Sequence, residues 1–242
     1  PEAAVIFDAR NIVGESIIWS TAEAALYWVD IVGSAIHRLD PASGAHRQWV
    51  TPELPTSIGL RRGGGFVVGL RQRVALWSPG GSFETFAVPE PDQPGNRLNE
   101  GVVAPDGSFW VGTMQDNIGA DGGPKPAPDR TGRLYRLSPE GKVTALCPER
   151  FGITNTMVWL DDGRFVTADT TINALLAFDY APVALTLTNA RPSRWLDPRP
   201  GERRIQLPRR WRSRHRQDPP IRHYRDDRAA GQFAHQLRLW RP

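Results

Sequence analysis

Short apolar runs separated by small polar turns recur along about the first 180 residues of the chain. In one of them, the aromatic and β-branched run of residues 26–29 is followed by a turn that contains Gly33 and then by an alternating stretch that begins at Ile36. Runs of this length, bounded by Gly, Pro, Asp and Ser, predict two β-strands joined in a hairpin. A hairpin alone could not bury its apolar face, so more strands are expected beside it.

The hairpin pattern returns three more times, at residues 65–77, 109–137 and 164–179. Each copy ends in a turn motif of the Asp/Ser-Pro-x-Gly type. These turn motifs begin at Asp40, Ser78, Ser138 and Asp179, at intervals of 38, 60 and 41 residues. The middle interval is lengthened by a loop rich in Gly, Pro and Asp, at about residues 115–131.

A period near 40 residues that consists of short strands predicts an all-β fold, a β-propeller with one four-stranded blade per repeat. About four blades are recognisable, and an opening strand is expected at residues 4–7. A solenoid is the competing interpretation. The absence of helical periodicity between the copies argues against most solenoids.

Charge divides the chain into two parts. Residues 191–242 contain 15 of the 28 arginines, neither lysine and only five acidic residues, a net charge of +10. Residues 1–190 carry −6, so the overall charge of +4 hides an acidic domain joined to a basic tail. We therefore expect a propeller domain at residues 1–184 and an atypical Arg-rich tail at residues 185–242.

The tail shows no blade period. Arg without Lys, mixed with Pro, Trp, His and Gln, is what a GC-rich coding region gives when it is read out of frame, and we favour that interpretation. A basic arm for nucleic acid and a disordered solvated tail are the alternatives.

Other sequence features bear on the compartment. No run of 18 apolar residues predicts a membrane span, and no secretory signal is visible at the start. A single cysteine, Cys147, excludes an intramolecular disulfide framework and favours a reducing compartment. We therefore expect a cytoplasmic protein with no membrane partner. Cys147 is interpreted as a small hydrophobic residue because no paired His lies near it.

Polar residues stand at the same place in three predicted blades, where the first strand begins: Glu15, Asn99 and Asn155. First strands line the channel of a propeller, so these side chains should converge there, and oxygen donors suit a hard divalent cation. Arg97 adds directed donors for a substrate carboxylate or hydroxyl. A solvated carboxylate at Glu15 and a capped hairpin corner at residues 96–101 are the alternatives.

Five phrases carry a resemblance to a known family: Gly14-Glu15 followed by Trp19, LYWVD at 26–30, RLNEG at 97–101, APDGSFWVGTM at 104–114 and TNTMVW at 154–159. In this order and spacing the chain resembles the gluconolactonase/regucalcin (senescence marker protein) family over roughly residues 10–182. The resemblance implies a six-bladed propeller, incomplete here, with one divalent metal ion (Ca, Zn, Mg or Mn) in the channel.

The resemblance also implies hydrolysis of sugar lactones to sugar acids, and thus a role in carbohydrate metabolism. It makes Glu15 and Asn155 metal ligands, and Arg97, Asn99 and Asn117 substrate-binding residues. Asn117 falls where some members have an acidic residue. The metal would polarise the lactone carbonyl and orient a water molecule for attack.

The chain departs from the family pattern at several positions. Ser16 and Thr156 stand where the family usually has Gly after its metal-binding Glu and Asn, and Glu100 stands where it usually has Asp. None of these changes removes a donor atom. The family's next ligand, an aspartate in a Pro-Asp-Gly phrase, has no match from residue 185 onward, so no catalytic base is assigned and we expect weak metal binding.

Three functions remain open. The first is a lactonase, with little activity expected because of the aberrant C-terminus. The second is a non-catalytic propeller that binds a metal or small molecule. The third is a nucleic-acid binder that acts through its tail, which lacks the aromatic and basic interleaving of such surfaces. The sequence does not determine the sugar or the oligomeric state.

Overall fold

The structure is a computed structural model that describes residues 4–192. Within this range the chain forms sixteen β-strands and one short 3₁₀ helix, Thr170–Ile172. The strands make four four-stranded antiparallel sheets, and each sheet consists of four consecutive strands. The four predicted blades are therefore confirmed, because each repeat forms one sheet.

Each sheet is one blade, and its strands are numbered in chain order. Blade 1 contains β1 (Gly14–Ser20), β2 (Ala25–Asp30), β3 (Ala35–Leu39) and β4 (His46–Val50). Blade 2 contains β5 (Ser57–Leu60), β6 (Phe66–Gly69), β7 (Val74–Trp77) and β8 (Glu84–Ala87). Blade 3 contains β9 (Asn96–Val103), β10 (Phe109–Gln115), β11 (Leu134–Leu137) and β12 (Val143–Ala145), and blade 4 contains β13 (Thr154–Trp159), β14 (Arg164–Asp169), β15 (Ala174–Ala181) and β16 (Thr186–Pro192).

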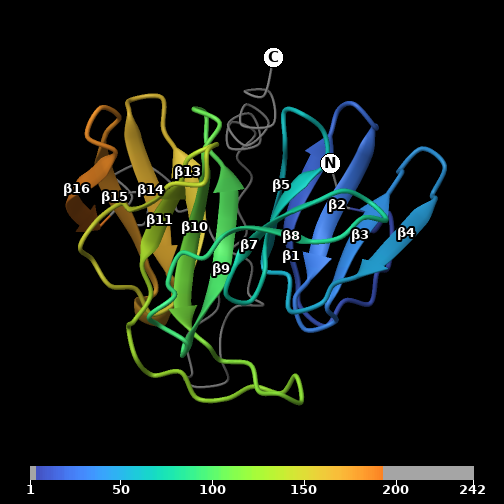
Figure 1. Cartoon of the computed structure of the whole chain (residues 1–242), viewed down its shortest axis with the longest axis horizontal. Coiled ribbons are helices and arrows are strands. Elements are labelled where there is room, and N and C mark those ends of the chain that lie inside the picture. The colour runs from blue at the N-terminus through green and yellow to red at the C-terminus, as the bar shows by residue number, and fades with distance from the viewer. Residues whose placement is uncertain (1–3, 193–242) are drawn as a thin grey trace.

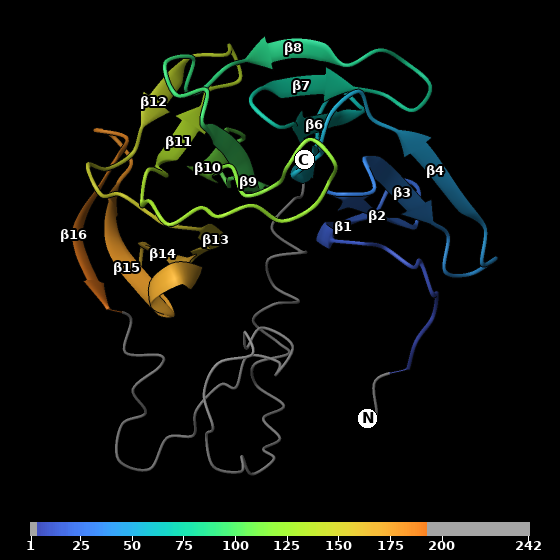
Figure 2. The ribbon, with the colours of Figure 1, turned by 90° about the horizontal axis from the view of Figure 1, so that it is seen from below.

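The blades stand side by side in chain order, from blade 1 in blue to blade 4 in orange (Figure 1). Seen along the perpendicular direction they form an arc, with the first strand of each blade on the inner side and the fourth on the outer side (Figure 2). Strand β5 packs beside β1 and β9, and β13 packs beside β9. The first strands therefore line the inner wall of the arc, as a propeller requires.

Three apolar clusters fill the spaces between successive blades. Tyr27 and Phe66 belong to the cluster between blades 1 and 2, and Val67 and Phe109 belong to the cluster between blades 2 and 3. Trp110 is fully buried in the cluster between blades 3 and 4. Neighbouring residues of a strand face opposite sides of the sheet. Phe66 and Val67 therefore enter different clusters, and both faces of blades 2 and 3 are buried.

Two buried aspartates hold the chain just before a first strand. Asp30, at the end of β2, accepts a 2.9 Å hydrogen bond from the amide of Val13. Asp169, at the end of β14, accepts bonds from the amides of Gly152, at 2.9 Å, and Ile153, at 3.3 Å. Burial by itself raises the pKa of both carboxyls, but the hydrogen bonds outweigh it and hold each pKa below its ordinary value.

The expectation of an opening strand at residues 4–7 is wrong. These residues form no strand, and the side chains of Val5 and Ile6 are 86% and 69% exposed. The segment pairs with none of the described sheets, so its backbone has no ladder to join, whatever its β-propensity. Among the described residues there is also no helix long and apolar enough to cross a membrane.

Blade 4 extends beyond the predicted domain boundary. Strand β16 pairs with β15 and ends at Pro192, beyond the boundary at residue 184 that the sequence predicts. Most of the Arg-rich tail, residues 193–242, lies outside the described residues. Its interpretation as an out-of-frame product therefore stays a prediction.

Candidate functional site on the inner strands

Backbone bulges mark the three first strands that carry the predicted site residues. The pairing of β1 with β2 shifts immediately after Glu15, and the pairing of β13 with β14 shifts immediately after Asn155. The pairing of β9 with β10 shifts opposite Asn99 and Glu100. A bulge bends its strand and re-aims a side chain, and bulges are common next to active sites. The three predicted polar positions are thus structurally equivalent.

Two carboxylates of different blades influence each other at this position. Burial raises the pKa of Glu15, the charge of Glu100 raises it further, and Arg97 lowers it in part. Burial also raises the pKa of Glu100, against the hydrogen bonds from the amides of Thr156 and Gly101. Partial desolvation and a like-charged neighbour both disfavour an anion, so this pair of carboxylates would gain from a nearby positive charge.

Glu100 also connects blade 3 to the strand that carries Asn155. The amide of Thr156 donates to Oε2 of Glu100, at 3.2 Å, and to Oδ1 of Asn155, at 3.1 Å. One N–H group therefore brings a carboxylate oxygen and an amide oxygen together. Glu15 is linked to this pair through its electrostatic coupling to Glu100.

The three predicted substrate-binding residues form one hydrogen-bonded cluster. Arg97 donates from Nε and Nη2 to Oδ1 of Asn117, at 3.1 and 2.9 Å, and from Nη1 to Oδ1 of Asn99, at 2.8 Å. Nδ2 of Asn99 donates to the carbonyl of Thr154, at 2.7 Å, which ties the cluster to blade 4. Arg97 is 5% exposed, and burial lowers its pKa to about 10.

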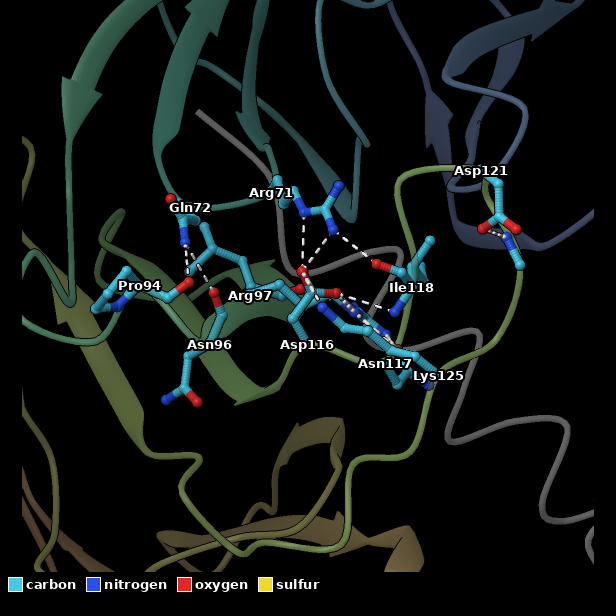
Figure 3. A network of polar contacts seen from close by, with 12 residues as sticks. Arg71, Gln72, Pro94, Asn96, Arg97, Asp116, Asn117, Ile118, Asp121 and Lys125 are labelled. Carbon is cyan, nitrogen blue, oxygen red and sulfur yellow. Dashed lines mark hydrogen bonds and ion pairs between the residues drawn. The ribbon is translucent and has the colours of Figure 1, made fainter.

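A charged network continues from Arg97 toward the loop that follows β10 (Figure 3). Asp116 is 6% exposed, and its Oδ2 atom lies 2.6 Å from Nη2 of Arg71 and 3.5 Å from Nζ of Lys125. Its Oδ1 atom lies 3.9 Å from Nε of Arg97. Burial alone would raise the pKa of Asp116, but the amide of Ile118 and the cations lower it. The same loop is anchored to blade 2, because Arg71 also donates to the carbonyl of Ile118 at 2.7 Å.

Sequence reasoning missed four residues that contact the predicted ones or their neighbours in the structure: Glu100, Arg71, Asp116 and Lys125. Glu100 directly follows Asn99, and Asp116 directly precedes Asn117, so both could have been included as neighbours of predicted residues. Arg71 and Lys125 carried no such signal, because 45 and nine residues of sequence separate them from Asp116. The described residues contain no group of three or more His, Cys, Asp and Glu side chains with metal-binding geometry.

Cys147 belongs to the core. It is buried, and burial together with Glu149 raises the pKa of its thiol to about 12. Burial and the neighbouring carboxylate thus disfavour the thiolate, which fits the interpretation of Cys147 as a small hydrophobic residue.

Residues 13–204 match a family described as the SMP-30/gluconolactonase/LRE-like region. One relative is the 6-deoxy-6-sulfogluconolactonase of Pseudomonas putida, which is 38% identical over 69% of this chain and 54% of its own length. Another is regucalcin from Gallus gallus, which is 33% identical over 71% of this chain and 56% of its own length. The chain thus spans about half the length of these relatives.

A solved structure has the same arrangement of blades. A luciferin-regenerating enzyme superposes with a TM-score of 0.68 at 29% sequence identity, over 75% of this chain and 60% of that protein. The correspondence covers the described arc and leaves further length of the other protein unmatched.

Proposed function

The chain belongs to the SMP-30/gluconolactonase/LRE-like family, and on this premise we propose that it is a metal-dependent hydrolase that opens the ring ester of sugar lactones. The observation that carries the proposal is a set of hydrogen bonds between neighbouring inner strands: the amide of Thr156 holds Glu100 and Asn155 together, and Asn99 joins Arg97 to blade 4. Electrostatic coupling to Glu100 adds Glu15 to this group. The relative from Pseudomonas putida is named for a lactone that bears a sulfonate, so the proposed class is sugar lactones with or without such a substituent.

The donor set fits a divalent cation. Glu15 and Asn155 would hold it, as the family resemblance implies, and Glu100 would supply a second carboxylate from blade 3. Oxygen atoms from carboxylates and an amide are the ligands that calcium and magnesium prefer. The raised pKa values of both glutamates support this assignment, because a cation would remove their electrostatic cost.

When bound, the cation would supply Lewis-acid polarisation of the lactone carbonyl and a lowered pKa for an attacking water molecule. The chain's own residues orient the substrate. Arg97 and Asn99 would hold ring hydroxyls or the ring oxygen, with the guanidinium fixed by Asn117. Water would add to the carbonyl carbon, the ring C–O bond would break, a proton from that water would pass to the released ring oxygen, and an open-chain sugar acid would leave.

A non-catalytic propeller that binds a metal or sugar is the second candidate. The family aspartate that has no match in residues 185–242 favours it. Lactone hydrolysis by the purified chain above the metal-free background would exclude this candidate. Binding of metal and sugar acid without turnover would support it.

The decisive variant is Arg97→Ala, with Arg164→Ala as a matched control at the start of β14. Losing a hydrogen bond from a charged donor costs about 1.5–3 kcal/mol, so kcat/KM should fall roughly tenfold to a hundredfold while metal affinity changes less. The control should retain its kcat/KM. An unchanged kcat/KM in a folded Arg97→Ala protein would refute the role of Arg97.

We also propose cytoplasmic localisation and a role in carbohydrate metabolism. The single cysteine supports the first, and the family supports the second. Imaging of a tagged full-length chain tests the localisation.

A further inference from the structure

We propose that Arg71 and Lys125 form a subsite for an anionic group, a sulfonate or a phosphate, carried by the substrate at the end remote from its lactone carbonyl. The inference rests on the proposed function, because it names the class of lactone that the same site takes. It follows from the charge and the geometry around Asp116.

Positive charge exceeds negative charge in this network. One carboxylate, Asp116, lies within 4.0 Å of the cationic groups of three side chains, namely Arg71, Arg97 and Lys125. Arg97 also interacts with Glu15, so Arg71 and Lys125 share the single negative charge of Asp116. One surplus positive charge is therefore left between Arg71, on the β6–β7 turn, and Lys125, on the loop that follows β10.

Two of the three cations keep donors for a ligand. Arg71 uses Nε and Nη2 for Asp116 and the carbonyl of Ile118, and its Nη1 group has no partner among residues 4–192. The side chains of Arg71 and Lys125 are 31% and 45% exposed, so solvent and solutes reach them. An ammonium and a guanidinium beside each other are the usual partners of a sulfonate or phosphate.

Arg97 joins this subsite to the lactone site. It interacts electrostatically with Glu15 on one side and with Asp116 and Arg71 on the other. A substrate held by Arg97 with its carbonyl near Glu15 would place its far end toward Arg71 and Lys125. Glu15 thus lies toward one end of the binding site and Arg71 with Lys125 toward the other, and the buried guanidinium of Arg97 links the two ends.

Asn117 makes the subsite receptive to an anion. Its Oδ1 atom accepts two hydrogen bonds from Arg97, at the position where the resemblance places an acidic residue in some members. An aspartate there would neutralise Arg97 and repel a substrate anion. The neutral amide fixes Arg97 without adding a further negative charge beside it.

The test compares three ligands that differ only at the far end: gluconate, 6-phosphogluconate and 6-deoxy-6-sulfogluconate. Isothermal titration of the full chain at low ionic strength should give Kd values at least about tenfold lower for the two anion-bearing ligands than for gluconate, with a difference that shrinks in salt. Comparing the phosphate with the sulfonate identifies the preferred group.

Variants of Lys125 and Asn117 test whether these residues determine the preference for an anionic group. Lys125→Met should reduce the preference for the anion-bearing ligands over gluconate severalfold, and Asn117→Asp should make the affinities for the three ligands equal. Lys142→Met, which removes the other lysine of the chain from an exposed turn in blade 3, should leave the ratio unchanged.

Three outcomes would overturn the proposal in whole or in part. Equal affinity of the wild-type chain for all three ligands overturns the subsite and leaves the lactone site standing. Inorganic phosphate that binds as tightly as 6-phosphogluconate overturns the link to the sugar. Absence of binding by all three ligands overturns the subsite and the proposed function together.

Discussion

Ser16 and Thr156 share a left-handed backbone conformation, with φ of 53° and 60°, and each directly follows a proposed metal ligand. Both are the positions where the family resemblance leads one to expect Gly. Glycine adopts positive φ at no steric cost, whereas a β-branched residue in this region is strained. The two bulges that aim Glu15 and Asn155 therefore require a backbone conformation that their sequence disfavours.

Thr156→Gly should stabilise the protein. The left-handed conformation costs an L-residue roughly 1–2 kcal/mol, part of which is offset by the greater chain entropy of unfolded glycine. Because the bonds to Glu100 and Asn155 come from the backbone amide, the substitution keeps them. We expect a gain of about 1 kcal/mol in the free energy of unfolding in urea. Thr144→Gly, in β12, is the control and should be destabilising. A loss of stability in Thr156→Gly would contradict the strain argument.

Glu100→Gln should have opposite effects on stability and on metal binding. Without metal the variant removes a desolvated charge beside Glu15, so its thermal midpoint should equal or exceed that of the wild type. With metal it lacks one carboxylate ligand, so its calcium affinity should fall about tenfold or more by titration calorimetry. Glu140→Gln, in the exposed β11–β12 turn, should change neither quantity. Wild-type calcium affinity in Glu100→Gln would remove Glu100 from the cation site.

Protonation of His37 should destabilise the fold below neutral pH. His37 is 3% exposed and stacks on Trp28, with its ring centroid 5.1 Å away, while Nδ1 faces Nε2 of His46 at 3.0 Å. Burial first and His46 second lower its pKa, whereas Asp30 raises it. The unfolded chain therefore binds more protons than the native one, and stability falls as pH decreases through about 6.5 toward the native pKa.

His37→Gln tests this dependence. The variant should show a smaller loss of urea stability than the wild type between pH 7 and pH 5, whatever its stability at pH 7. The raised pKa values of Glu15 and Glu100 act with the opposite sign, since their protonation favours the native state, and the difference between variant and wild type removes their contribution. Equal slopes in the two proteins would assign the pH dependence to other groups.

The sequence predicted the blades well because each repeat encodes one local unit. Strand, turn and strand are close in the chain, and both faces of an internal blade are apolar, so runs such as FWVG at 109–112 are unmistakable. The strand expected at residues 4–7 does not form, because local propensity says nothing about whether a partner strand exists. An apolar run becomes a strand only where a ladder is available.

Sequence predicted which polar residues occupy equivalent positions on the inner strands, but it did not predict the charged network beside them. Equivalent blade positions gave Glu15, Asn99 and Asn155 as candidates, and a motif gave Arg97. The contact of Arg71 with Asp116 joins a turn of blade 2 to a loop of blade 3, and no periodicity encodes such a pair. The departures at Ser16 and Thr156 left the donor atoms intact, and their effect on backbone conformation became visible only in the bulge geometry.

Asp169 should be a main determinant of stability in blade 4. Besides the two amides before β13, its Oδ1 atom accepts bonds from the amide and the hydroxyl of Thr171, at 3.0 and 2.7 Å. Its side chain is fully buried, and its second oxygen lies 3.0 Å from Nη2 of Arg130. An amide in this place would turn one oxygen into an N–H₂ group that faces other donors.

Asp169→Asn should therefore lower the free energy of unfolding by about 2–4 kcal/mol, as expected when buried donors lose a charged acceptor. Asp162→Asn, an exposed acid on the β13–β14 turn, should change it by less than about 0.5 kcal/mol. Because the pKa of Asp169 is lowered in the native state, its contribution is present above pH 3.8 and is lost as pH falls through the native value. The difference between wild type and Asp169→Asn in urea unfolding should accordingly persist at pH 5 and shrink only in stronger acid. A variant as stable as the wild type would mean that the amides before β13 find other acceptors.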